Sequence, residues 1–339
     1  MKIKIDTSEF NRALKELSKE YKIFAPSVKP FKGTFSDTDL ISYSKIESFE
    51  EIEFSKKSNY SPKETFLPIN QILFYYTEDQ YKESNIEDKK LLVFMRSCDI
   101  HGVKRIDEIY LNNGHEPDYF YKRIRDKVKF VLIGCKESYR NCFCVSMNSN
   151  KTNDYSIGMN IDNDTIYLDI KDRDLEIFSG ETTDFEVDYV KENKISIEVP
   201  QKIDLESLKN DSLWKEYDSR CIGCGRCNFV CPTCTCFTMQ DIFYKENKNA
   251  GERRRVWASC QVDGYTDIAG GHSFRSSQGD RMRFKVMHKI SDFKERFGYN
   301  MCVGCGRCDD ACPEYISFSN CVEKIDKIEK ERGGKQHGK

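Results

Sequence analysis

The chain has 339 residues, enough for two or more domains that each bury a core without covalent crosslinks. Its 54 Lys and Arg residues nearly balance 56 Asp and Glu residues, a net charge of -2, so no global field draws it to nucleic acid or to an anionic membrane. The longest apolar runs are far shorter than the roughly 20 residues of a membrane span, so we expect a soluble, cytoplasmic protein that binds neither membranes nor nucleic acid.

The first part of the chain alternates between helical and extended patterns, which is typical of an α/β domain. Residues 6–21 have apolar side chains at helical spacing, and residues 21–27 follow as an extended run. Between residues 89 and 135, two buried strands ("KLLVFM" and "VKFVLIG") enclose two amphipathic helices ("DIHGVKRIDEIYL" and "DYFYKRIRDK"). Short β-like pieces then predict an antiparallel extension up to Pro200: "TIYLDI", "FEVDYV" and "KISIEV".

Helical patterns return near residue 205, and the density of cysteines rises soon afterwards. We predict helices in four segments: "DLESLKNDSLWKEYDSR", "MQDIFYKEN", "DRMRFKVMHKISDFKERFG" and "SFSNCVEKIDKIEKERG". The predicted organisation is a mixed α/β domain over residues 1–205, a mostly α-helical domain over residues 206–330, and a disordered tail over residues 331–339.

Two near copies of one cysteine pattern lie in the second domain, "RCIGCGRCNFVCP" and "MCVGCGRCDDACP". Both read C-x2-C-x2-C-x3-C-P, and in a reducing compartment such clustered cysteines are more consistent with metal ligands than with disulfides. Three thiolates at this spacing wrap one face of a 4Fe-4S cube, while the fourth reaches the other cube of a two-cluster arrangement. The first ladder is Cys221, Cys224, Cys227 and Cys231, and the second ladder is Cys302, Cys305, Cys308 and Cys312.

In this two-cluster arrangement, each site takes its fourth cysteine from the other ladder. Cys312 joins the first three cysteines of the first ladder, and Cys231 joins the first three of the second ladder, so that both sites bind iron. Glycines between the cysteines let the backbone approach the sulfides closely. The alternative is a pair of four-cysteine zinc sites, but a zinc knuckle needs only two closely spaced cysteines and gains nothing from a third and a fourth followed by proline. The pattern therefore favours two 4Fe-4S clusters.

A separate group of cysteines lies in the first domain: Cys98, Cys135, Cys142 and Cys144. Their spacing matches no general motif. Cys98 and Cys135 follow the two predicted buried strands, and the carboxyl ends of neighbouring parallel strands are where α/β sheets place ligands. A third 4Fe-4S cluster, a zinc site and buried thiols are all compatible with this group.

The other four cysteines have no ligand spacing of their own: Cys234, Cys236, Cys260 and Cys321. Cys234 and Cys236 follow the first ladder directly, where they could tune a cluster or replace a ligand, although packing beside it is favoured. We expect Cys260 and Cys321 to be structural.

Motifs for substrate chemistry are missing from the sequence. There is no G-x-G-x-x-G between a strand and a helix, no P-loop, no G-x-S-x-G and no H-E-x-x-H, and we assign no catalytic residue. Six arginines gather between Arg253 and Arg283, where they form either a patch for an acidic partner or an ordinary ion-paired face. A chain with many cluster ligands and no substrate site is expected to conduct electrons from one partner to another.

The chain resembles the iron-sulfur electron-transfer component of anaerobic sulfite reductase over nearly its whole length. The resemblance rests on these runs: "FAPS", "GTFSDTD", "RSCDI", "YLNNG", "FVLIGCKES", "NCFCVSM", "YDSRCIGCGRCNFVCPTCTC", "GERRR", "WASC", "AGGHSFR" and "MCVGCGRCDDACP". It implies a three-subunit cytoplasmic complex in which a flavin subunit oxidises NADH, this chain relays electrons, and a siroheme subunit reduces sulfite to sulfide. It also implies a third 4Fe-4S cluster on Cys98, Cys135, Cys142 and Cys144.

The same resemblance implies an oxidoreductase subunit without a sulfite-reducing site of its own. A siroheme reductase carries C-x5-C followed by C-x3-C, and the only C-x3-C pairs here lie inside the ladders. More distant relatives, similar to the β subunit of cytoplasmic sulfhydrogenases, share the same arrangement of cysteines. A relay in a hydrogenase is therefore one alternative, and a metal-stapled regulatory module is the alternative from another class.

Overall fold

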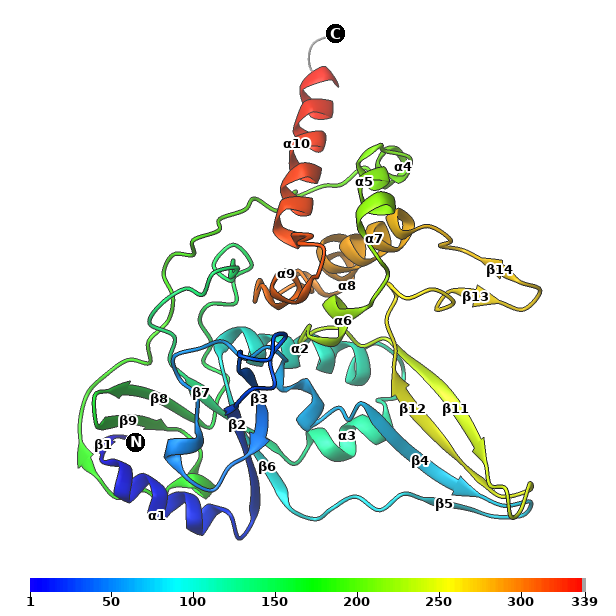
Figure 1. The fold of residues 1–339 in the computed structure, drawn as a ribbon. Coiled ribbons are helices and arrows are strands. Elements are labelled where there is room, and N and C mark those ends of the chain that lie inside the picture. The colour runs from blue at the N-terminus through cyan, green and yellow to red at the C-terminus, as the bar shows by residue number, and fades with distance from the viewer. Residues whose placement is uncertain (337–339) are drawn as a thin grey trace. The chain divides into compact units, whose positions relative to one another are not determined.

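A computed structural model describes residues 1–336, and the chain divides into two compact units (Figure 1). Unit 1 consists of Met1–Glu137, Lys151–Val190 and Phe237–Trp257. Unit 2 consists of Ser138–Asn150, Lys191–Cys236 and the described chain from Ala258 onwards.

This division differs from the predicted boundary at residue 205. Residues 138–150 join unit 2 because their backbone is bonded to the second ladder, as described below. Residues 237–257 join unit 1 because they form a pair of strands, the second of which pairs with strand β4 (Asn70–Tyr76) of that unit. Neither long-range pairing leaves a signal in the local sequence pattern.

An eight-stranded mixed sheet forms the centre of unit 1, in the order β10-β1-β9-β8-β7-β6-β2-β3. The strands β2, β6, β7 and β8 are parallel neighbours, and the remaining pairs are antiparallel. The strands are β1 (Lys2–Ile5), β2 (Tyr21–Lys29), β3 (Leu40–Lys45), β6 (Lys90–Met95), β7 (Val128–Ile133), β8 (Ile157–Asp162), β9 (Thr165–Ile170) and β10 (Glu181–Thr182).

Both faces of this sheet are buried, which explains the continuous apolar runs of its central strands. Along β6, Leu92 and Phe94 pack in one core cluster, whereas Val93 and Met95 pack in another. The first cluster includes residues of helix α1 (Thr7–Leu17), and the second includes residues of α2 (Ser97–Leu111) and α3 (Tyr119–Arg125). The mixed α/β prediction is therefore confirmed for this unit. Short 3-10 turns complete it: η1 (Phe49–Glu51), η2 (Pro62–Thr65) and η3 (Arg173–Leu175).

Two sequence predictions fail in the β regions. The segment "MQDIFYKEN", predicted as a helix, lies mostly in strand β11 (Phe237–Phe243), because it pairs along its length with β12 (Gly251–Trp257). These strands form a second sheet in the order β11-β12-β4-β5, which ends at β5 (Tyr81–Glu83). Of the three β-like pieces predicted before Pro200, only "TIYLDI" is a strand, because "FEVDYV" and "KISIEV" have no ladder partners.

Helices and long loops make up unit 2. The helices are α4 (Leu205–Lys209), α5 (Leu213–Arg220), α6 (Arg226–Phe229), α7 (Gln278–Met287), a π-helix η4 (His288–Asp292), α8 (Phe293–Phe297), α9 (Arg307–Ala311) and α10 (Phe318–Gln336). A hairpin of β13 (Asp267–Ile268) and β14 (His272–Ser273) also belongs to this unit. The prediction of a mostly helical domain is confirmed only in part, because loops carry much of the cysteine-rich sequence.

The end of the chain also differs from the prediction. Helix α10 continues to Gln336, across most of the segment predicted as a disordered tail, while residues 337–339 lie outside the described residues. Within residues 1–336, none of the helices combines the length and the apolar character needed to cross a bilayer.

The six clustered arginines do not form one solvated patch. Each has a carboxylate or ring partner: Arg253 with Asp241, Arg254 with Glu252, Arg255 with Asp118, Arg281 with Asp263, Arg283 with Asp280, and Arg275 with the ring of Phe284. Arg255 and Arg281 are buried. The ion-paired alternative therefore describes these residues better than a docking patch.

Buried Arg255 gives a test of how β12 is fixed in unit 1. Its guanidinium bonds to Asp118 Oδ2 at 2.7 Å and to Gln71 Oε1 at 2.8 Å, while Asp118 Oδ1 accepts the Tyr121 amide at the start of α3. Replacing Asp118 by Ala removes a helix cap and leaves a buried charge without its carboxylate, a loss of roughly 3 kcal/mol in the free energy of unfolding.

Asp6→Ala is the matched control, because Asp6 also caps a helix, α1, but is exposed and neutralises no buried cation. Urea unfolding followed by circular dichroism should show a clearly larger loss for Asp118→Ala. Equal losses for the two variants would mean that the cap alone matters and that the Arg255 pair contributes nothing.

Candidate metal centre

The first three cysteines of the first ladder lie on two short helical elements of unit 2 and the loop between them, and Cys231 follows the second element. Cys221 ends α5, and Gly225, with φ +75°, begins α6, which carries Cys227. Cys221, Cys224 and Cys227 line one cavity, and Cys312 of the second ladder lines the same cavity. Cys308 also reaches this cavity, together with the buried amine of Lys285. Thiols from both ladders therefore meet at one site.

The second ladder repeats this local geometry. Gly306, with φ +69°, begins α9, which packs against α6 and carries Cys308. Backbone amides point at cysteine sulfurs here: Gly304 N lies 3.4 Å from Cys302 Sγ, and Ile316 N lies 3.3 Å from Cys312 Sγ. Such donors stabilise negative charge on sulfur.

Cys231, the fourth cysteine of the first ladder, lies beside the second ladder. Its Sγ is 3.6 Å from Lys289 Nζ, and the backbone oxygen of Lys289 accepts the amides of Met301 and Cys302. Burial raises the pKa of the Cys302 thiol to about 12, and negative charge on Cys231 adds to this shift. The fourth cysteine of each ladder is thus placed near the first cysteines of the other.

Two buried lysines lie between the sulfurs, and they were not predicted from the sequence. Lys285 and Lys289 are 5% and 3% exposed. Burial lowers the pKa of each amine, but neighbouring thiolates outweigh burial and raise it, Cys227 and Cys308 for Lys285 and chiefly Cys231 for Lys289. The available signal was a pair of lysines four residues apart on the apolar side of a predicted helix, a position that a charge occupies only when it is paired.

A segment from the middle of the chain covers the second ladder. Phe143 N donates to Gly304 O at 2.8 Å, the Cys142 thiol lies 3.5 Å from Cys305 O, and Ser149 Oγ donates to Val303 O at 2.5 Å. A Cβ atom added to Gly304 would lie 2.5 Å from Phe143 O. We call residues 141–149 the cover segment. Gly304 is therefore needed for contact with the cover segment, a role that was not predicted from the sequence.

The four cysteines outside the predicted ligand sets form hydrogen bonds within unit 2. Cys234 hydrogen-bonds Cys231, and Cys236 hydrogen-bonds Cys260, whose pKa this contact lowers. Asn228 Nδ2 also lies 3.0 Å from Cys260 Sγ. Cys321 is buried on α10 and bonds to Tyr217. No disulfide joins any of the sixteen cysteines, all of which lie in the described chain.

The four cysteines of the predicted first-domain site fall in both units. Cys98 lies in the first turn of α2 directly after β6, and Cys135 follows β7, so two parallel neighbours each deliver a cysteine at their carboxyl ends as predicted. Cys135 Sγ donates to Glu137 O at 3.3 Å. Cys142 and Cys144 belong to unit 2. A third cluster on these four cysteines stays a prediction.

Within residues 1–336, no three histidine, cysteine or carboxylate side chains close around one point as they would around a single metal ion. A 4Fe-4S cube makes a different demand, because each cysteine binds a different iron and the four sulfurs surround a volume. Buried thiols, backbone donors to sulfur and two buried cations suit such an anionic group. The residues of the two ladders therefore fit a pair of 4Fe-4S clusters.

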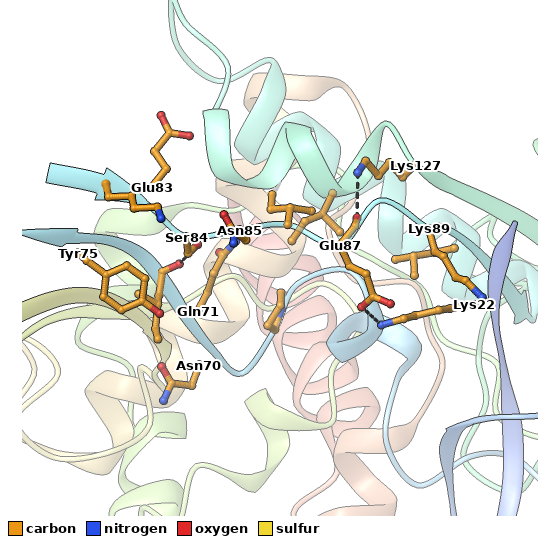
Figure 2. Close-up of a pocket in the computed structure, with 16 residues that line it drawn as sticks. Lys22, Asn70, Gln71, Tyr75, Glu83, Ser84, Asn85, Glu87, Lys89 and Lys127 are labelled. Carbon is orange, nitrogen blue, oxygen red and sulfur yellow. Dashed lines mark hydrogen bonds and ion pairs between the residues drawn. The ribbon is translucent and has the colours of Figure 1, made fainter.

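The groove drawn in Figure 2 belongs to unit 1 and measures about 630 Å³. None of the residues that line it is a cysteine. Lys22 pairs with Glu87, the Lys127 amine donates to the Glu87 carbonyl at 2.9 Å, and Ser84 Oγ donates to the Ile72 carbonyl at 2.6 Å. These polar groups fasten the connection between β5 and β6, so we assign the groove no part in the metal centre.

Comparison with known proteins agrees with this geometry. Residues 220–316 match the family model described as a 4Fe-4S dicluster domain, a range that includes both ladders. The chain is 29% identical to sulfhydrogenase 2 subunit beta of Pyrococcus furiosus over 342 aligned residues, which cover 94% of this chain and 95% of that protein. No solved structure matches the chain. The match at residues 220–316 supports the predicted dicluster domain.

The close approach of the cover segment gives a prediction. Gly304→Ala adds a methyl group that meets the Phe143 carbonyl, and the residue also keeps φ +62°. Gly298→Ala is the matched control, since Gly298 has φ +83° but no atom within 4 Å of its added Cβ. The control should lose about 1 kcal/mol of unfolding free energy from backbone conformation alone, whereas Gly304→Ala should lose a further ~1–3 kcal/mol from overpacking.

Thermal unfolding under oxygen-free conditions, with iron counted per chain, would measure both effects. We expect Gly304→Ala to lose iron as well as stability. If the two variants had the same stability and iron content, the cover segment would not be packed on the second ladder as described.

Proposed function

We propose that unit 2 holds two 4Fe-4S clusters with crossed ligation. One cluster is bound by Cys221, Cys224, Cys227 and Cys312, and the other by Cys302, Cys305, Cys308 and Cys231. The proposal is supported by the shared cavity of the first set and by the place of Cys231 beside Cys302 and Lys289. A third 4Fe-4S cluster on Cys98, Cys135, Cys142 and Cys144 is proposed on the family resemblance.

The proposed role is an electron relay within a cytoplasmic oxidoreductase complex. Each cluster, when bound, takes up and releases one electron at a time. The residues of the chain hold the thiolates, donate amides to sulfur and place two buried ammonium groups beside them. Nearby cations and donors favour the more negative, reduced state, so Lys285 and Lys289 raise the reduction potentials of both sites.

For the partners, we propose a flavin subunit that oxidises NADH and a siroheme subunit that reduces sulfite to sulfide. This rests on the resemblance to the iron-sulfur component of anaerobic sulfite reductase. The second candidate is the relay subunit of a sulfhydrogenase, which is favoured by the similarity to sulfhydrogenase 2 subunit beta across most of both chains. Both candidates assign this chain the same role and differ in the terminal acceptor.

Anaerobic purification of the native complex separates these candidates. We expect the tagged chain to carry along a flavin protein and a siroheme protein, and we expect NADH-dependent sulfite reduction to require this chain. A nickel-iron partner without siroheme would favour the sulfhydrogenase relay. A chain that binds zinc, has no partner and shifts DNA in a salt-dependent manner would instead indicate a regulatory module.

Crossed ligation predicts which cluster each fourth cysteine serves. The electron paramagnetic resonance spectrum of dithionite-reduced Cys231→Ser should match that of Cys305→Ser and differ from that of Cys224→Ser, because Cys231 belongs to the second site. Cys321→Ser is the control, since Cys321 is a buried cysteine outside both ladders and should keep both signals and the full iron content. A Cys231→Ser spectrum that matched Cys224→Ser would contradict the crossing.

A further inference from the structure

The two ladders share the local sequence C-x-G-C-G-R-C, yet the structure places them in opposite environments. Ile222 is 61% exposed, whereas its counterpart Val303 is 2% exposed. Cys224 is exposed and its counterpart Cys305 is buried. Sequence similarity between the ladders therefore does not mean equal access to a partner protein.

The arginine of the motif shows the same asymmetry. Arg307 in the second ladder is fully buried, whereas Arg226 in the first ladder is exposed and its side chain has no hydrogen bond or ion pair with any described residue. The cover segment explains part of the difference, because it bonds to Val303, Gly304 and Cys305. No segment makes the corresponding backbone bonds to Ile222, Gly223 and Cys224 within the described chain.

Two further exposed apolar side chains, Val262 and Tyr315, lie beside the first ladder. Val262 lies so close to Gly225 that an added Cβ atom would be 2.8 Å from its methyl group. Tyr315 is 86% exposed, and its amide donates to Cys312 O at 3.2 Å. Its φ of +52° is uncommon for an aromatic residue, and such backbone strain persists where function requires the conformation. The result is an apolar rim around a cysteine that faces solvent.

The charges on this rim are few. Arg220 is paired with Glu216, and Asp263 is paired with Arg281. Arg226 is the cation left for a partner, while Glu314 is an exposed carboxylate at the Cys312 side of the rim. A partner carboxylate would therefore be attracted toward Arg226 and repelled from Glu314, which fixes its orientation.

We propose that Ile222, Arg226, Val262 and Tyr315 form the binding surface for a one-electron donor protein that has a carboxylate beside its cofactor. This inference rests on the proposed clusters. One electron leaves the reduced donor and reduces the first-ladder site, and no bond forms or breaks. A small apolar contact with a charged edge is typical of transient redox complexes, which bind weakly and exchange quickly. In the second ladder, the counterparts of Ile222 and Arg226, Val303 and Arg307, are buried and offer no such surface.

Stopped-flow mixing with flavodoxin hydroquinone, an acidic one-electron donor, tests the surface. Ile222→Glu and Arg226→Glu should each lower the second-order rate constant about tenfold at low salt, because each places negative charge at the contact. Phe243→Glu is the matched control, because Phe243 is also 61% exposed and apolar but lies on β11 of unit 1. We expect it to stay within about twofold of the unmodified chain.

A second readout does not depend on the rate of electron transfer from flavodoxin. The electron paramagnetic resonance signal of the first-ladder site is the one absent from Cys224→Ser, and that of the second-ladder site is the one absent from Cys305→Ser. A soluble dysprosium complex should relax the first signal more strongly than the second, because Cys224 is exposed and Cys305 is buried. Unchanged rates for Ile222→Glu and Arg226→Glu, or stronger relaxation of the second signal, would overturn the proposed surface. If the unmodified chain held no reducible iron, the proposal of the clusters itself would be refuted. This outcome differs from unchanged rates in a chain that holds iron, so refutation of the surface and refutation of the clusters are distinguishable.

Discussion

Negative charge on buried sulfur is the constraint on which unit 2 depends. Thiolates in an interior of low dielectric are costly unless cations or hydrogen-bond donors compensate them. Lys285 and Lys289, on the continuous α7–η4 segment, place two ammonium groups among the cysteines. Backbone amides near Cys302 and Cys312 add donors at fixed positions. The ladders, the lysines and the cover segment therefore form one interdependent site rather than two independent loops.

Much of the architecture follows from local patterns in the sequence. The strands at residues 90–95 and 128–133 are predictable, because burial on both faces requires continuous apolar runs. The ladders are predictable, because their spacing is set by the cluster they fit. The strand at residues 237–243 is not predictable in this way, because its conformation depends on pairing with residues 251–257, which in turn pair with residues 70–76.

The candidate site shows the same limit. The eight ladder cysteines are visible as a motif, whereas the two lysines give only a weaker signal, their place on the apolar side of a predicted helix, which does not show what pairs with them. The recruitment of residues 141–149 depends on hydrogen bonds between residues far apart in the sequence, as with Ser149 and Val303, which are 154 positions apart. Nothing in the nearly identical ladder sequences indicates that Ile222 is exposed and Val303 buried. Tertiary contacts alone decide which ladder is exposed, and the partner surface that we propose depends on that difference.

The central claim is that both ladders together build two adjacent 4Fe-4S sites. The most direct measurement is the electron paramagnetic resonance spectrum of the fully reduced chain, with acid-labile sulfide assayed on the same sample. Adjacent reduced clusters interact magnetically, so the spectrum should be broadened and split, and this interaction should vanish in Cys305→Ser. Narrow, independent signals in the reduced chain, or bound zinc without acid-labile sulfide, would contradict the account.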